Sequence, residues 1–304
     1  MIDFILNDRD VRASAPPGGV VLDFLRRSQR LAGIKEGCRE GDCGACLVLV
    51  GEWSGDTVLY RPINSCLLPL AEIEGKHVIT IEGPNDRGEG TPNPIRQAIV
   101  DEGATQCGYC TPGIILALTG FFLGNTRFEE KQAMAALGGN ICRCTGYQSI
   151  KRAAARLCAI FPPSDLEDNK MPVGPLVEKG IVPPYFLQIP GRLRRLSVPD
   201  KSSIEISPRN TIVGGGTDLW VQRPDDLYEG DFTCVSRQRD LKGIRIENGH
   251  CHIGTATTFQ EMEDSPVMRD PFPNIPKYFE RIASRPIRYR ATVGGNIVNA
   301  SPIG

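Results

Sequence analysis

The chain has 304 residues, which is enough for two or three domains with sizeable cores, and its formal net charge is −1. Charged residues make up only 23% of it and form no polybasic block, which argues against a protein that binds nucleic acid electrostatically. The sequence contains no apolar run of the roughly 18 residues that a membrane span needs, and its first residues lack the basic start of a secretory signal. We therefore expect a cytoplasmic protein.

Residues 1–83 predict a small mixed sheet with one helix near residues 20–30. The β-like runs that define the sheet occupy residues 2–6, 47–50, 57–60 and 78–81. Residues 84–161 instead predict four short helices, which begin at Asn93-Pro94, at Thr111-Pro112, near Phe128 and at Gln148. The first half of the chain is therefore expected to hold a compact α+β domain and a helical bundle.

Residues 162–190 contain seven prolines and few periodic apolar positions, so we expect an extended linker there. Residues 191–304 alternate short β-like runs with short helices, as an α+β domain does. The predicted fold class is therefore α+β with several domains.

The eleven cysteines fall into two groups of four and three single residues. A disulfide framework is improbable in a reducing cytosol, so the clustered cysteines are better interpreted as metal ligands. The single residues Cys158, Cys234 and Cys251 have apolar neighbours and are expected to be buried packing residues.

The first group has the C-x4-C-x2-C spacing of a plant-type 2Fe-2S ferredoxin loop, with a fourth cysteine farther along the chain. Its members are Cys38, Cys43, Cys46 and Cys66. Glycines in KEGCREGDCGAC let the backbone fold closely around a cluster. The alternative is a structural zinc site, which usually shows paired C-x2-C motifs instead.

The second group pairs the C-x2-C of QCGYCTPG with the C-x-C of NICRCTGY, and its members are Cys107, Cys110, Cys142 and Cys144. Each pair precedes a predicted helix, the first with Thr111 as N-cap, and a positive helix end stabilises thiolates. We predict a second 2Fe-2S site, with a zinc ribbon as the alternative.

The two cysteine groups, in this order, resemble the iron-sulfur region of the molybdenum hydroxylases, the xanthine dehydrogenase and aldehyde oxidase family. The resemblance covers residues 1 to about 160 and implies a β-grasp ferredoxin-like domain followed by a four-helix 2Fe-2S bundle. It also implies that Gln106, the residue before Cys107, contacts the pterin of the molybdenum cofactor. An ordinary surface glutamine is the alternative interpretation.

Two glycine-rich segments follow the expected linker. TIVGGGTDLW places Gly214, Gly215 and Gly216 after a β-like run and before Thr217 and Asp218. Such glycines allow backbone amides to approach a diphosphate, although a tight turn is the simpler interpretation of this segment alone. The second segment is ATVGGNIVNASPIG, with the candidate residues Thr292, Gly294, Gly295, Asn296 and Ser301.

Both segments resemble the FAD-binding domain of the same family, in which the first loop holds the pyrophosphate and the second lines the flavin. The resemblance places the remaining half of that domain beyond Gly304, so we expect residues 191–304 to be a truncated N-terminal part of it. Between the two segments, RIASRPIRYR carries four arginines. A solvated helix face is the usual meaning of such a run, and contact with the flavin phosphates or with another subunit is the alternative.

Together these features resemble the small iron-sulfur and FAD subunit of a two-subunit bacterial enzyme of the family. That resemblance implies a large molybdopterin-binding partner in an (αβ)2 assembly, and NAD as the electron acceptor during purine hydroxylation. No residue of this chain is expected to be catalytic on the purine. A stand-alone redox carrier, and a subunit acting on aldehydes, carbon monoxide or aromatic rings, are the alternatives.

Overall fold

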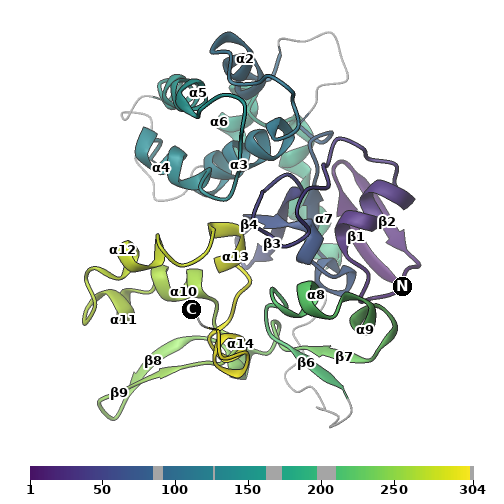
Figure 1. Cartoon of the computed structure of the whole chain (residues 1–304), viewed down its shortest axis with the longest axis vertical. Helices are drawn as coiled ribbons and strands as arrows, with labels where there is room; N and C mark the ends of the chain where they lie inside the picture. The colour runs from purple at the N-terminus through teal and green to yellow at the C-terminus, as the bar shows by residue number, and fades with distance from the viewer. Residues whose placement is uncertain (85–91, 126, 162–172, 197–209, 302–304) are drawn as a thin grey trace.

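A computed structural model describes residues 1–84, 92–125, 127–161, 173–196 and 210–301. Figure 1 shows a helical part at one end of the molecule, a sheet beside it, and the residues after 210 at the other end. Within the described ranges, no helix has both the length and the apolar composition to cross a membrane.

The sheet has five strands in the order β2-β1-β5-β3-β4. Its strands are β1 (Ile2–Leu6), β2 (Arg9–Ala13), β3 (Leu47–Ser54), β4 (Thr57–Asn64) and β5 (His77–Ile79). β1 and β5 are parallel, whereas the other neighbouring strands are antiparallel. Parallel strands must be joined by a long connection. Between β1 and β5, this connection includes the helix and the first cysteine loop.

The side chains of β1 alternate between the two faces of the sheet, and both faces are covered. Phe4 and Leu6 share a core with Leu22 of α1 (Val21–Asp23), a helix that continues as the π-helical turn η1 (Phe24–Ser28). Ile5 points to the opposite face and packs against α7 (Ile189–Leu196). The α+β, ferredoxin-like character predicted for this region is confirmed.

Four helices follow, as predicted: α2 (Pro94–Asp101), α3 (Thr111–Gly124), α4 (Glu130–Ala136) and α5 (Gln148–Cys158). α5 is amphipathic, with Ile150, Ala153, Ala154 and Leu157 buried on one face. α3 is apolar all round and buried for most of its length, and it shares its core with Leu49 of β3. The bundle therefore packs directly against the sheet.

The expectation of an extended linker at 162–190 is wrong for its described part. There the chain forms α6 (Val173–Glu178), the 3-10 turn η5 (Pro184–Gln188) and the start of α7. Leu176, Phe186 and Ile189 are fully buried. Prolines lie in the first turn of these elements, where a residue needs no amide hydrogen. They therefore do not exclude packing. Residues 162–172 lie outside the described part.

The residues after 210 form two small β units and several short helices. β6 (Thr211–Val213) pairs in parallel with β7 (Phe232–Cys234), and β8 (Ile244–Glu247) forms a hairpin with β9 (His250–Ile253). The helices are α8 (Leu219–Gln222), α9 (Pro224–Glu229), α10 (Phe259–Asp264), α11 (Pro266–Arg269), α12 (Ile275–Phe279), α13 (Arg285–Arg288) and α14 (Val293–Val298).

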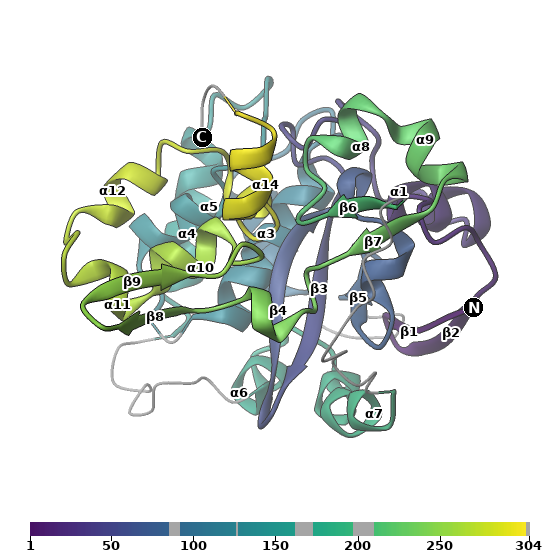
Figure 2. The same ribbon diagram turned by 90° about the horizontal axis from the view of Figure 1, so that it is seen from below.

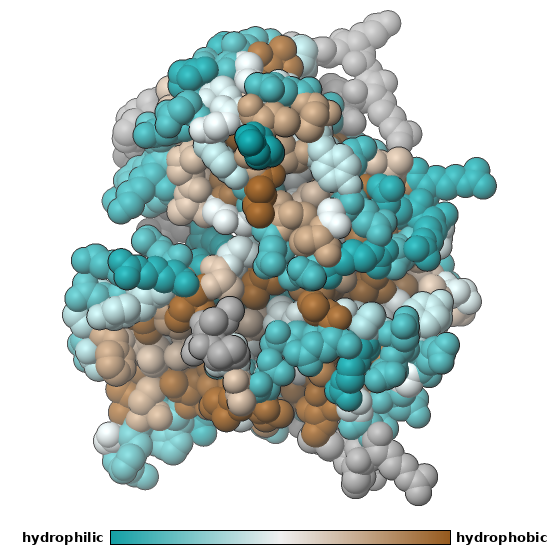
Figure 3. Space-filling view, viewed as in Figure 1, coloured by the Kyte–Doolittle hydropathy of each residue, from teal (hydrophilic) through white to brown (hydrophobic). Residues whose placement is uncertain are grey.

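This last part lies on one side of the sheet, with α6 and α7 on the other side (Figure 2). Figure 3 shows apolar atoms gathered over the same part of the molecule. The exposed apolar residues there include Ile246, Ile297 and Val298. The arrangement places the two glycine segments next to the first cysteine domain.

Candidate iron-sulfur and flavin sites

The first cysteine group lies on the loop between η1 and β3, with Cys66 on the 3-10 turn η2 (Ser65–Leu67) after β4. The Asn64 side-chain amide donates to the Gly41 carbonyl at 2.6 Å, and the Ser65 hydroxyl donates to the Cys46 carbonyl at 2.6 Å. These bonds fix the loop against the end of β4. They bring all four predicted ligands to one end of the sheet.

Within this group the thiols form two hydrogen-bonded pairs, Cys38 with Cys43 and Cys46 with Cys66. The bond that Cys66 donates lowers the pKa of Cys46 to about 7, although burial acts in the opposite direction. Burial also opposes ionisation of Cys38, but amide donors, including Glu40 N at 3.4 Å, outweigh it and lower the pKa of that thiol. The loop therefore favours the thiolate form, which binds iron, at Cys38 and Cys46, whereas burial raises the pKa of Cys43 and the bond donated to Cys46 raises that of Cys66.

The second group also forms two pairs. The sulfurs of Cys107 and Cys144 are 3.6 Å apart, and the Cys110 thiol donates to Cys142. Burial and this donated bond raise the pKa of Cys110 to about 12. The Tyr147 hydroxyl accepts a hydrogen bond from the Cys142 amide at 2.9 Å, a contact that the sequence alone did not reveal.

One detail of the predicted helix start is wrong. Cys110 itself occupies the N-cap of α3, and Thr111 is the first helical residue. The Thr111 hydroxyl is 2.7 Å from the Thr105 hydroxyl and makes no capping bond. Cys110 has helical backbone angles, so the helix begins one residue earlier than the cap preference of threonine indicates.

The pairwise arrangement fits a two-iron cluster, in which each iron takes two thiolates. A mononuclear zinc site needs four ligands around one point. The arrangement in pairs is therefore compatible with the predicted 2Fe-2S clusters.

The two cysteine loops contact each other directly. The Ile141 amide donates to the Cys43 carbonyl at 3.0 Å, and the Asn140 side chain donates to the Gly44 carbonyl at 3.2 Å. Gly44 has a φ of 66°, and a Cβ there would lie 2.3 Å from the Gly139 carbonyl oxygen, so this close approach requires glycine. Ile141 precedes Cys142, so one hydrogen bond joins the backbones of the two groups.

The second group lies near an exposed apolar surface. Cys107 and Cys144 are exposed, whereas Cys46 and Cys66 are buried. Around the exposed pair, Tyr109 and Ile141 keep 48% and 57% of their surface accessible, and Tyr147 is also exposed. Gln106 is exposed beside Cys107, and its side chain makes no hydrogen bond to any residue that the structure describes.

The two glycine segments meet. A Cβ on Gly214 would lie 2.4 Å from the Thr292 hydroxyl, and one on Gly215 would lie 1.8 Å from the Arg290 carbonyl oxygen. The Asn299 side chain donates to the Asp218 carboxylate at 3.0 Å. Residues that are far apart in the sequence and were predicted to share one ligand therefore lie in one place.

The backbone amides of the two glycine segments differ in whether they already donate hydrogen bonds within the protein. Those of residues 214–217 donate no hydrogen bond to any described residue. In the second segment, the Gly294 amide donates to the Thr255 carbonyl at 2.8 Å and the Gly295 amide to the Thr292 hydroxyl at 3.1 Å. Asn296 lies on α14, and Ser301 lies shortly after this helix. The Ser301 amide donates to the Asn296 carbonyl at 3.2 Å. The first loop thus has donors for an anion, as a diphosphate loop requires.

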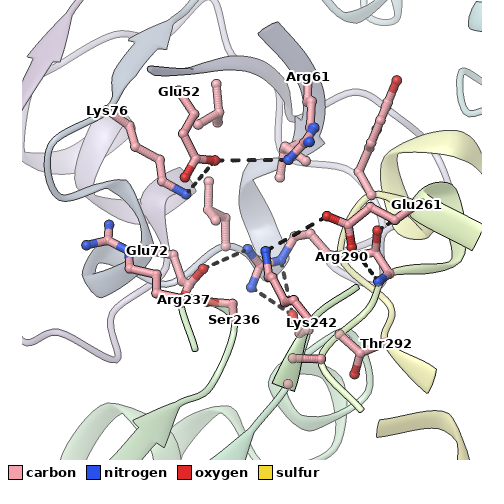
Figure 4. A pocket seen from close by; sticks show the side chains of 18 of the residues that line it. Glu52, Arg61, Glu72, Lys76, Ser236, Arg237, Lys242, Glu261, Arg290 and Thr292 are labelled. Atoms are coloured by element: carbon pink, nitrogen blue, oxygen red, sulfur yellow. Dashed lines mark hydrogen bonds and ion pairs between the residues drawn. The ribbon is translucent and has the colours of Figure 1, made fainter. Parts of the chain in front are cut away.

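A cavity of about 130 Å³ lies between the first glycine loop and the sheet (Figure 4). The charged side chains lining it come from both sides and are Glu52, Arg61, Glu72, Lys76, Arg237, Lys242, Glu261 and Arg290. Five are basic and three acidic, so the lining carries a net positive charge. Such a field attracts anions.

The arginine run at 281–290 is not a solvated helix face. Arg288 is buried, pairs with Glu263 at 3.2 Å and donates to the carbonyls of Phe279 and Ala283, both at 2.9 Å. Arg290 is also almost inaccessible, and it contacts the glycine loop. These arginines hold carbonyl oxygens inside the protein, a role that a count of charges along the sequence does not distinguish from exposure.

The three single cysteines differ in how deeply they are buried. Cys158 is buried and Cys234 is half-buried, and burial raises the pKa of the Cys158 thiol to about 11. Cys251 is exposed on the hairpin strand β9, so the prediction of burial is wrong for it. Its neighbours His250 and His252 in β9 are exposed too.

Comparison with known proteins finds three family models along the chain. A 2Fe-2S iron-sulfur cluster binding domain matches residues 4–70, a [2Fe-2S] binding domain matches residues 80–155, and the FAD binding domain in molybdopterin dehydrogenase matches residues 200–304. These models match in the order that the two cysteine groups and the glycine segments predicted.

Among curated relatives, the xanthine dehydrogenase of Blastobotrys adeninivorans is 40% identical over 156 residues, covering 50% of this chain and 11% of that protein. Aldehyde oxidase 1 of Cavia porcellus is 37% identical over 158 residues, covering 51% of this chain and 12% of that protein. The xanthine dehydrogenase of Emericella nidulans is 28% identical along 99% of this chain and 26% of its own length. The chain thus spans only a small part of each of these relatives.

Among solved structures, quinoline 2-oxidoreductase from Pseudomonas putida 86 is 30% identical, with a TM-score of 0.41 over 51% of this chain and 89% of that one. On the sequence matches and the three domains, this chain belongs to the molybdenum hydroxylase family, and its domains are iron-sulfur and flavin domains of the kind that carry electrons.

Proposed function

We propose that this chain is the electron-transfer subunit of a xanthine dehydrogenase. It would pass electrons from a molybdenum cofactor on a large partner subunit through two 2Fe-2S clusters to FAD and then to NAD during purine hydroxylation. The observation that carries this proposal is the pair of four-thiolate groups, joined by the Ile141 to Cys43 hydrogen bond, of which only one is exposed.

The exposure of the second cysteine group indicates the direction in which electrons would pass along the proposed route. Cys107 and Cys144 lie at the surface with Gln106, Tyr109 and Ile141 around them, the kind of apolar patch that a partner covers. The Gln106 side-chain amide, which bonds to no residue in the described part of the chain, would hydrogen-bond a pterin held by the partner. The second cysteine group would therefore receive electrons first.

The first group faces the residues after 210. A cleft of about 770 Å³ separates Cys38 and Cys66 from α8 and α9, and Trp220 lines its far side. Next to α8, the amides of residues 214–217, which donate to no described residue, would hold the FAD diphosphate, with the Thr217 hydroxyl and Asp218 beside them. Thr292, Gly294, Gly295, Asn296 and Ser301 would line the flavin.

The cofactors supply the redox chemistry when they are bound: each cluster carries one electron at a time, and the flavin collects two for release as a hydride. The chain holds thiolates at fixed positions, keeps Cys46 and Cys66 away from water, and presents amides to an anion. It makes and breaks no bond in the substrate.

The order of two iron-sulfur regions and a flavin region in one chain favours xanthine dehydrogenase over relatives that divide these parts among separate subunits. Aldehyde oxidases also match along nearly the whole chain, so an aldehyde-oxidising complex is the second candidate. A stand-alone carrier would have no use for the apolar surface around the second cysteine group.

The test is rapid anaerobic mixing of the complex, chain and partner together, with xanthine. We expect bleaching of both cluster bands and then of the flavin, and we expect Gln106→Ala to slow cluster reduction at least about tenfold while leaving both clusters and FAD in place. Gln132→Ala, which changes an exposed glutamine on α4, is the control.

Unchanged kinetics in Gln106→Ala would return that residue to an ordinary surface role. Reduction by an aldehyde and not by xanthine would replace the proposed substrate with the second candidate. A purified chain that never associates with a molybdopterin protein would favour the stand-alone carrier.

A further inference from the structure

Arg290 connects the glycine loop to the domain of the first cysteine group. Its Nε and Nη2 atoms donate to the Gly215 carbonyl at 3.1 and 2.7 Å, and its Nη1 lies 3.7 Å from the Glu72 carboxylate (Figure 4). The two side chains are only 9% and 5% exposed. Gly215 follows β6, whereas Glu72 lies on the 3-10 turn η3 (Leu70–Ile73) shortly after Cys66.

Glu72 is held as a charged anchor. The Ser236 hydroxyl donates to its carboxylate at 2.6 Å. Burial alone would raise the pKa of Glu72, but Arg290 and the nearby Lys76 outweigh burial and hold it at about 2. The carboxylate therefore stays ionised at any physiological pH and fixes the guanidinium.

The bidentate bond to Gly215 determines where the loop amides point. The peptide unit between Gly215 and Gly216 is planar, with its C=O and N–H directed oppositely. Holding the Gly215 oxygen on Arg290 therefore turns the Gly216 amide away from the arginine. This amide and its neighbours in residues 214–217 are the ones that donate to no described residue.

We infer that Arg290 is a positioning residue, anchored by Glu72, that holds the glycine loop open for the diphosphate of the flavin dinucleotide and ties it to the domain of the first cysteine group. This inference rests on the proposed flavin function. It assigns the arginine to the orientation of the loop, because two of its N–H groups donate to the Gly215 carbonyl and its charge faces the Glu72 carboxylate.

The surrounding charges are compatible with this role. Lys76 and Arg61 face Glu52 at 3.5 and 4.0 Å, Lys242 faces Glu261 at 3.9 Å, and Arg237 donates to the Glu74 carbonyl at 2.6 Å. None of these basic groups touches the Gly215 carbonyl. Arg290 is therefore the side chain whose removal would release the loop.

The experiment measures binding of FAD and of ADP, which carries the diphosphate without the flavin ring, to the complete protein in its complex. We expect Arg290→Ala to weaken both ligands at least about tenfold while cluster absorbance stays unchanged. Arg290→Lys should recover part of the loss, because lysine keeps the charge opposite Glu72 without the two-pronged donor. Arg245→Ala, at an exposed pair with Glu247, should bind like the wild type.

Wild-type affinity for FAD and ADP in Arg290→Ala would overturn the inference and leave the flavin function standing. A wild-type protein that binds neither ligand would overturn both. Should Arg290→Ala fail to fold, Glu72→Gln provides the same test: it keeps the shape and the Ser236 contact but removes the charge. We expect it to weaken both ligands by about threefold, and unchanged affinity would contradict the anchor.

Discussion

Replacing Cys43 with serine should remove one cluster and leave the other, so that the iron content falls by about half. The reason is that the two thiolate groups lie in different parts of the fold, and each pairs its ligands internally. Serine leaves the Cys43 carbonyl in place, so the hydrogen bond from Ile141 should survive. Electron paramagnetic resonance of the reduced protein measures the two signals separately.

Cys110→Ser should give the reciprocal loss. Cys158→Ser, at a buried cysteine outside both groups, should keep both signals and serves as the matched control. Loss of both signals in a folded Cys43→Ser protein would show that the eight ligands are grouped differently.

Changing Gly215 to alanine should abolish flavin binding while both clusters remain. An added Cβ would lie 1.8 Å from the Arg290 carbonyl oxygen, and this neighbour is backbone, so it cannot rotate away. Such overpacking typically costs about 1–3 kcal/mol of stability and moves the backbone. The shift would separate the glycine loop from the segment that begins at Thr292.

The readouts are flavin content and thermal unfolding of the purified complex. Gly191→Ala in α7 is the control, because a Cβ there meets no atom within 4 Å. Stoichiometric flavin in Gly215→Ala would mean that the two glycine segments do not form one site.

The sequence alone predicted four of the five strands of the sheet and the four helices of the bundle, because each depends on local patterns, but it missed β2. Cysteine spacing reflects the reach of a short loop around a cluster, and the burial of Ile150, Ala153 and Leu157 follows from helical periodicity. The start of α3 was misplaced by one residue, an error within the uncertainty of helix ends.

Contacts between distant segments could not be predicted in this way. The prolines of the expected linker indicated an extended chain, but Phe186 and Ile189 find apolar partners on the sheet and the bundle. The arginine run indicated a solvated face, but Arg290 reaches Glu72, which lies in another part of the sequence. A local sequence pattern does not show which distant residue a group contacts. The hydrogen bond from Ile141 to Cys43 was missed for this reason too.

The most direct test of the account is analysis of iron, acid-labile sulfide, zinc and flavin in the purified complex. The account predicts four irons and four labile sulfides for each copy of this chain, with one FAD, because eight cysteines form two groups that each suit a 2Fe-2S cluster. About two zinc ions for each chain, without labile sulfide and in a colourless protein, would contradict it.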